Sequence, residues 1–139
     1  MARIRCCTAS GCRAAGGPAL MQALLQARAD QGLASDALTI KPVGCLRLCG
    51  RGPLVAIDAA DGGAQRLYGA VPPASAPVLV QLALAAHAPG VAASLAGHAV
   101  DGEHPFFALQ QPVVLEGLGL VDPESLDDAL AHGAYSQLQ

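Results

Sequence analysis

CCTASGC at residues 6–12 and CLRLC at residues 45–49 are the two stretches that decide what this chain can build. Each stretch holds a pair of cysteines, separated by four residues in the first and by three in the second: Cys7 and Cys12, Cys45 and Cys49. When a fold brings two such stretches together, they present four thiolates to one site. Iron–sulfur clusters are commonly held by four cysteine thiolates, and the spacing also falls within the range of structural zinc sites.

The composition is that of a chain that can bury one core of ordinary domain size. Of the 139 residues, 53% are hydrophobic and 14% are charged, which excludes the class of highly charged disordered chains. No apolar run reaches the roughly 18 residues of a membrane span, and the start MARIRCC lacks the apolar core of a signal peptide. We therefore expect no membrane span and a cytoplasmic location, either free or attached to a membrane through a complex. In a reducing compartment, paired cysteines are metal ligands or redox groups more often than disulfides.

The charges are unevenly divided along the chain. The net charge is -3, yet residues 1–51 hold seven basic and two acidic side chains, whereas the remainder holds one basic and nine acidic ones. The basic part carries the cysteines. Its positive charge either compensates an anionic cluster or belongs to an ordinary solvated face. The negative total, the 3% of aromatic residues and the lack of an Arg/Lys run argue against nucleic-acid binding.

Hydrophobic periodicity and turn residues predict the order β-α-β followed by β-β-α, which is the element order of a thioredoxin-like α/β fold. Pro18 suits the first turn of one helix and Gly32 its end, and Ser75 suits the N-cap of a second helix over 77–87. A hairpin turn is expected at residues 61–63. Strands are expected at residues 3–6, 39–43, 53–58 and 66–71.

The rest of the chain is expected to form a linker and a second unit. Residues 89–103, rich in Ala and Gly, look like a linker between a domain at 1–88 and a unit at 104–139. In this unit a short strand is expected at 113–115, followed by a helix that has a cap, a first residue and a stop: Asp122, Pro123 and Gly133. A helix this short is not stable alone in water, so it is expected to dock on another surface.

The cysteine pattern resembles a known family. CCTASGC followed by VGCLRLCGRGP is similar to the thioredoxin-like 2Fe–2S ferredoxin module, whose pattern is C-x4-C, thirty-odd residues, then C-x3-C; here 32 residues separate Cys12 from Cys45. That module occurs alone, as the small subunit of respiratory NADH dehydrogenase, and fused to the NADH-binding flavoprotein subunit of NAD-linked hydrogenases and formate dehydrogenases. FFALQQPVVLEGLGLVDPESLDDALAHGAY, residues 106–135, resembles the start of that flavoprotein subunit.

The resemblance implies a thioredoxin-like ferredoxin fold with a short C-terminal helical extension. It implies electron transfer through a 2Fe–2S cluster, as one module of an NADH-linked flavoprotein oxidoreductase that is not catalytic alone. Its partners would be the flavin- and NADH-binding domain or subunit and other iron–sulfur subunits, with a homodimer also open. The family's glycine-rich nucleotide-binding stretch does not occur before Gln139, so we expect no FMN or NAD site in these residues. The ligands, two for each iron, would be Cys7 and Cys12, and Cys45 and Cys49.

Two other readings of the four cysteines stay open. One is a four-cysteine zinc domain with a scaffold role. The other is a cluster-free thioredoxin-like docking domain or dithiol protein, although the chain lacks the C-x-x-C motif that redox catalysis favours.

The residues around the cysteines carry weaker expectations. In an extended strand Cys6 points away from Cys7, which makes Cys6 a spare buried thiol; alternatively Cys6 replaces Cys7 as a ligand. Arg47 and Arg51 either tune a cluster, face an acidic partner or are solvated, and Asp127 and Asp128 are expected to be surface charges. Four glycines are expected either to let backbone approach the sulfur atoms or to serve turns: Gly11, Gly44, Gly50 and Gly52. The histidines share no ligand spacing with the cysteines and are expected at the surface or at helix ends: His87, His98, His104 and His132.

Overall fold

A mixed five-stranded sheet lies at the centre of the computed structural model, which describes residues 1–58, 60, 64–85 and 89–138. The strands lie in the order β2-β1-β3-β4-β5. β1 and β2 are parallel, and the other neighbouring pairs are antiparallel. Their bounds are β1 (Ala2–Cys7), β2 (Leu38–Val43), β3 (Val55–Asp58), β4 (Arg66–Tyr68) and β5 (Ala99–Val100).

The predicted helices are present in the predicted order. Short unpredicted α-helices are added at Ser10–Ala14, Pro89–Ser94 and Pro105–Ala108. The predicted β-α-β and β-β-α units are present, and the fold class α/β is confirmed. No helix of the described residues is long and apolar enough to cross a membrane. The α-helices are α1 (Ser10–Ala14), α2 (Gly17–Asp30), α3 (Ala76–Leu84), α4 (Pro89–Ser94), α5 (Pro105–Ala108) and α6 (Leu126–Ala131). Single 3-10 turns are η1 (Cys49–Arg51), η2 (Pro73–Ser75), η3 (Ala96–His98) and η4 (Ser136–Leu138).

The ends of α2 lie where Pro18 and Gly32 predict them. Pro18 stands in the first turn, where a missing N–H costs nothing, and Gly32 adopts φ +64° just past the end. The helix turns one side to the sheet, so that Leu24 is fully buried while Leu25 remains 41% exposed. At α3, Ser75 occupies the predicted N-cap position but makes no capping hydrogen bond with its side chain.

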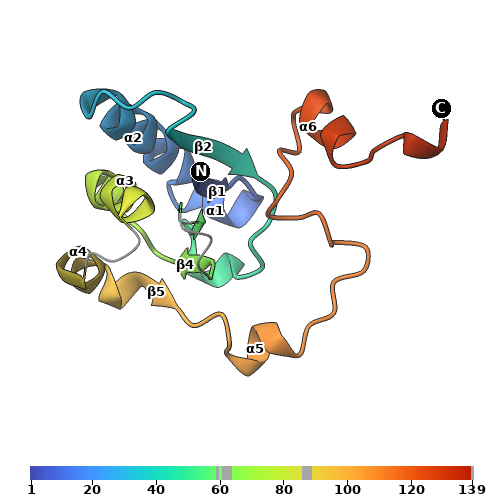
Figure 1. Cartoon of the computed structure of the whole chain (residues 1–139). Helices are drawn as coiled ribbons and strands as arrows, with labels where there is room; N and C mark the ends of the chain where they lie inside the picture. Colours follow the sequence, from blue (N-terminus) through green and yellow to red (C-terminus); the bar gives the residue numbers. More distant parts are fainter. Residues whose placement is uncertain (59, 61–63, 86–88, 139) are drawn as a thin grey trace.

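The two faces of the sheet have different roles. Successive residues of a strand point to opposite faces, so Ile4 and Cys6 point toward α2 and α3, while Arg5 and Cys7 point the other way. α2 and α3 lie side by side on the first face (Figure 1), and the large side chains buried there contribute roughly 1.5–3 kcal/mol each. The second face is left for the cysteine loops and the C-terminal segment.

Residues 89–100 differ from the expected linker. They form α4 and β5, and β5 pairs with β4 through Leu67 opposite Val100 and Tyr68 opposite Ala99. Leu95 is 1% exposed and belongs to the main core. The many small residues of this segment allow close packing, and the single buried Leu95 is too weak a pattern to reveal it in the sequence. The expected turn at 61–63 and the expected helix end at residue 87 lie outside the described residues, and α3 ends at Leu84.

The segment after β5 extends past the body of the protein, drawn from orange to red in Figure 1. The strand expected at 113–115 is wrong, because these residues lie in bends and turns and Val114 is 93% exposed. The cap of α6 is Ser125, whose hydroxyl accepts the Asp128 N–H at 3.1 Å. Asp122 instead accepts the Glu124 N–H in a turn before the helix, at 2.9 Å. Pro123 therefore precedes α6 and does not begin it, and Gly133 follows its end at φ +89°, as predicted.

Candidate metal centre

The two cysteine stretches leave neighbouring strands at the same end of the sheet. β1 and β2 are parallel with Cys7 opposite Val43, so the segments after the two strands start side by side. Thr8 joins them, because its N–H and its hydroxyl both donate to the Val43 carbonyl oxygen, at 2.9 and 2.8 Å. Residues that are far apart in the sequence therefore lie close together at one end of the sheet.

Each cysteine is held by a different kind of element. Cys7 is the last residue of β1, and Cys12 lies in α1. The expected first strand ended at residue 6, before Cys7, and the short α1 was not predicted. Cys45 lies in the loop after β2, as expected, and Cys49 is the first residue of η1.

The four sulfur atoms come together as two pairs. The Cys45 and Cys49 Sγ atoms are 3.6 Å apart, and Cys7 lies close enough to Cys12 to raise the pKa of its thiol. The two stretches also approach each other, because a Cβ at Gly11, the chain neighbour of Cys12, would lie 3.3 Å from the Cys49 Cβ. Among the described residues, no group of three or more His, Cys, Asp or Glu side chains could hold a metal ion.

The protonation of the thiols shows what a metal must displace. Burial, and next the hydrogen bond with Cys7, raise the pKa of Cys12 to about 12. The pKa of Cys49 is also raised, first by its hydrogen bond with Cys45. Metals bind thiolates, so binding here releases protons and is favoured by higher pH.

Two of the four glycines allow the loops to approach. A Cβ at Gly52 would lie 3.1 Å from the Cys12 Cα and 3.2 Å from its Sγ, and a Cβ at Gly11 would lie 3.3 Å from the Cys49 Cβ. The expected close approach to a cysteine sulfur is found for Gly52, whereas Gly11 approaches the Cβ and backbone of Cys49. Gly50 has open space around it, and Gly44 instead faces Leu118 of the C-terminal segment.

One hydrogen bond to sulfur comes from a residue that the sequence did not single out as a donor. The N–H of Arg47 donates to the Cys45 Sγ at 3.3 Å. Arg47 has φ +68°, a left-handed conformation that costs a non-glycine residue about 1 kcal/mol or more. The conformation turns the N–H toward the sulfur. Because the residue is not a glycine, nothing in the sequence indicates this turn.

Exposure divides the four cysteines. Cys7 and Cys12 are buried at 3% and 0% exposure among apolar neighbours that include Val43 and Leu54. Cys45 is half-buried and Cys49 is exposed. A cofactor held here would be anchored in the protein on one side and reach the surface on the other.

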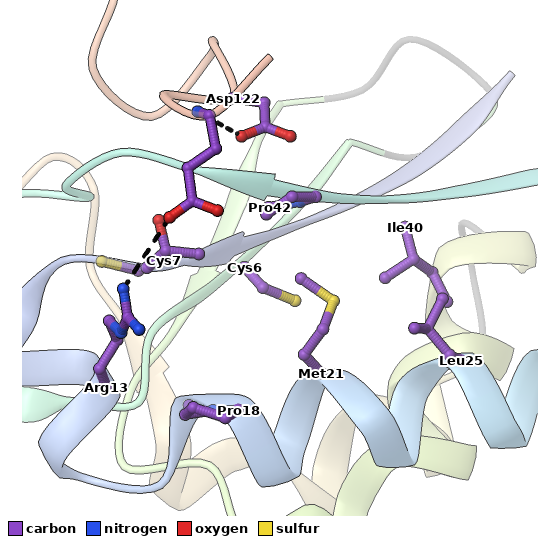
Figure 2. Close-up of a pocket in the computed structure, with 12 residues that line it drawn as sticks. Cys6, Cys7, Arg13, Pro18, Met21, Leu25, Ile40, Pro42 and Asp122 are labelled. Atoms are coloured by element: carbon purple, nitrogen blue, oxygen red, sulfur yellow. Dashed lines mark hydrogen bonds and ion pairs between the residues drawn. The ribbon is translucent and has the colours of Figure 1, made fainter.

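Cys6 is confirmed as a spare buried thiol. Figure 2 shows it pointing toward Met21 of α2, while Cys7 points to another side. It lines an apolar cavity of about 350 Å³ with Met21, Leu25 and Ile40. Burial raises the pKa of Cys6 to about 12, with a smaller contribution from Cys7. Alternation along β1 is the physical reason that Cys6 and Cys7 point to opposite faces of the sheet.

The described histidines have local structural roles. The ring of His98 contacts the Gly69 carbonyl oxygen, and the ring of His104 caps α5 by accepting the Phe106 N–H. His132 ends α6, and its Nδ1 lies 2.8 Å from the Asp128 carbonyl oxygen. These three lie at the ends of η3, α5 and α6, in keeping with the expected surface or helix-end positions, and His87 lies outside the described residues.

Comparisons with known proteins support the fold. No protein-family model matches the chain, and no curated protein matches it. Among solved structures, the thioredoxin-like [2Fe-2S] ferredoxin from Aquifex aeolicus matches with a TM-score of 0.52 and 20% identity, over 73% of this chain and 97% of that chain. A cysteine-to-serine variant of the same ferredoxin matches with a TM-score of 0.55 and 21% identity, over 73% and 99%. The chain has the thioredoxin-like ferredoxin fold.

Proposed function

We propose that this chain transfers electrons, one at a time, through a 2Fe–2S cluster. The observation that carries the proposal is the meeting of two cysteine pairs at one end of a sheet that has the thioredoxin-like ferredoxin fold. When bound, such a cluster accepts and returns a single electron. The ligands would be Cys7 and Cys12 for one iron, and Cys45 and Cys49 for the other.

The residues around the site suit this role. Val43 and Leu54 exclude water from the side of Cys7 and Cys12. The N–H of Arg47 donates to the Cys45 sulfur, and such a bond stabilises the added negative charge of a reduced cluster. The exposed Cys49 brings the site to the surface, where electrons can be exchanged with a partner.

The proposed partner is an NADH-binding flavoprotein, to which residues 106–135 bear a resemblance. Large apolar side chains along this segment are exposed, as on a surface that another protein covers. They include Leu109, Val113, Val114 and Tyr135. The cluster would pass electrons to or from a flavin in that partner, and the chain itself would contribute no catalytic group.

Anaerobic purification with iron, sulfide and zinc analysis tests the cofactor. We expect a red-brown protein with two irons and two sulfides per chain, whose visible absorption bleaches with dithionite. A colourless protein with one zinc per chain would establish the zinc domain instead. A colourless, metal-free protein that also fails anaerobic reconstitution would leave the docking-domain reading.

NADH tests the second half of the proposal. Alone, the chain should be reduced by dithionite but not by NADH, and an added flavoprotein subunit of an NADH dehydrogenase or NAD-linked hydrogenase should make NADH effective. Reduction of the isolated chain by NADH would contradict the absence of an FMN or NAD site. If a panel of such subunits had no effect on a protein that holds the cluster, the partner would be wrong while the cofactor stood.

A further inference from the structure

The C-terminal segment is fastened to the cysteine side of the body at three places. We call residues 118–128 the strap. Arg5 Nη1 donates to the carbonyl oxygen of Gly119. The N–H of Gly44 donates to the Val121 carbonyl oxygen at 3.2 Å, and Lys41 Nζ lies 2.7 and 2.6 Å from the two carboxylate oxygens of Asp128.

The first of these contacts is made by a buried charged side chain. Arg5 is 3% exposed and lies on the same face of the sheet as Cys7. Its guanidinium donates to both oxygens of Asp58, at 2.7 and 2.9 Å, and to the Gln65 side chain at 2.8 Å. The strap carbonyl accepts a further N–H, and a buried donor left without a partner is unfavourable. Undocking of the strap would therefore leave one N–H of the buried Arg5 without this partner.

The packing is as specific as the hydrogen bonds. A Cβ at Gly44 would lie 2.7 Å from Leu118 Cδ2, and a Cβ at Gly119 would lie 2.9 Å from Leu46 Cδ2. Gly119 also has φ +84°, which disfavours any other residue. Each glycine receives a leucine from the opposite segment.

The contacts fall on both sides of one cysteine. Gly44 and Leu46 are the chain neighbours of Cys45, so the strap holds the backbone before and after this residue. Beside it lies a hollow of about 430 Å³, whose wall includes Cys45, Arg47, Leu115 and Leu118. The strap and the residues before it thus limit the space that water has next to Cys45.

We propose that the strap positions the Cys45 loop and limits access of water and small molecules to the Cys45 side of the site. This inference rests on the proposed function for its effect on a cluster, but the docking itself can be measured with or without metal. An opened strap would expose the cluster to solvent, which raises its reduction potential. It would also speed loss of iron to a chelator.

A pair of glycine variants isolates the strap. Gly119→Ala should weaken docking, because its backbone conformation is strained for alanine and its Cβ displaces the end of the Leu46 side chain. Gly117→Ala is the matched control, since its Cβ would lie 3.6 Å from Val121, an ordinary contact. Lys41→Met removes a different fastening without touching the strap's backbone, and Lys41→Arg restores the charge.

Hydrogen–deuterium exchange of the purified chain gives the first readout. Exchange at residues 44–46 should become about five- to thirty-fold faster in Gly119→Ala, corresponding to about 1–2 kcal/mol of lost docking. Lys41→Met should show the same change to a smaller degree, and Lys41→Arg and Gly117→Ala should match the wild type. Wild-type exchange in Gly119→Ala and Lys41→Met would overturn the proposal.

The reduction potential and the rate of iron release to a chelator give the second readout. Both should rise in Gly119→Ala and in Lys41→Met and stay unchanged in Gly117→Ala. If exchange quickens but the potential and the release rate do not move, the strap is merely structural and the proposal fails. If the wild type holds no cluster, the proposed function fails by itself, while the exchange result still decides whether the strap holds the Cys45 loop.

Discussion

The two cysteine pairs are held in opposite ways. Cys7 and Cys12 lie in a strand and a helix, and both are buried. Cys45 and Cys49 lie in a loop and a 3-10 turn, and they are half-buried and exposed. The first pair is fixed by the core of the fold, whereas the second needs local support from Arg47 and from the strap. We call the buried pair, Cys7 and Cys12, the anchored side of the site, and the more exposed pair, Cys45 and Cys49, the adjustable side.

Removal of a ligand is expected to have the largest effect. Cys7→Ala should abolish the cluster, because one iron would lose half of its thiolate ligands. The neighbouring Cys6→Ala should retain the cluster and lose only the packing of a buried side chain, about 1 kcal/mol. Iron and sulfide analysis of both variants, with urea unfolding, tests the comparison. Loss of the cluster in Cys6→Ala and its retention in Cys7→Ala would exchange the roles of the two cysteines.

Closing the gap beside the anchored pair should have an intermediate effect. The Cβ of Gly52→Ala would meet the backbone and the sulfur of Cys12, and such overpacking typically costs 1–3 kcal/mol. Gly50→Ala faces open space and should stay within about 0.5 kcal/mol of the wild type. Urea unfolding and cluster content measure the difference. Equal behaviour of the two variants would show that the anchored side is not closely packed.

The smallest expected effect is a pH dependence of the strap. The hydrogen bond from Lys41, and next the one from the Asp122 N–H, lower the pKa of Asp128 below its ordinary 3.8. A lowered pKa in the folded state means that the ion pair stabilises the protein above about pH 4 and loses this contribution as the pH falls further. The free energy of unfolding of Asp128→Asn should lie about 1 kcal/mol below that of the wild type at pH 7.

The difference between the same two proteins should shrink as the pH falls below about 4 toward the lowered pKa of Asp128. Urea unfolding of cluster-free samples across pH 3–7 measures this, since acid then has no cluster to release. A constant difference across the range would mean that Asp128 acts through packing and not through its charge.

Features of the site that follow from local patterns could be predicted from the sequence, whereas features that depend on contacts between distant residues could not. The periodicity of α2 and the alternation of β1 are local patterns, so they predict the order of elements along the chain and the direction of Cys6. The strap depends on contacts between distant residues, such as Arg5 with Gly119, which leave no periodic signal. The left-handed turn at Arg47 and the cap at Ser125 are choices that the tertiary structure makes among several compatible residues.

Electron paramagnetic resonance of the dithionite-reduced protein tests the central claim most directly. One electron added to two coupled ferric ions leaves a single unpaired spin, so we expect one S = 1/2 signal that integrates to about one spin for each pair of bound irons. The oxidised protein should give no such signal. A reduced wild-type protein without this signal, after anaerobic reconstitution with iron and sulfide, would contradict the assignment of the four cysteines to a 2Fe–2S cluster.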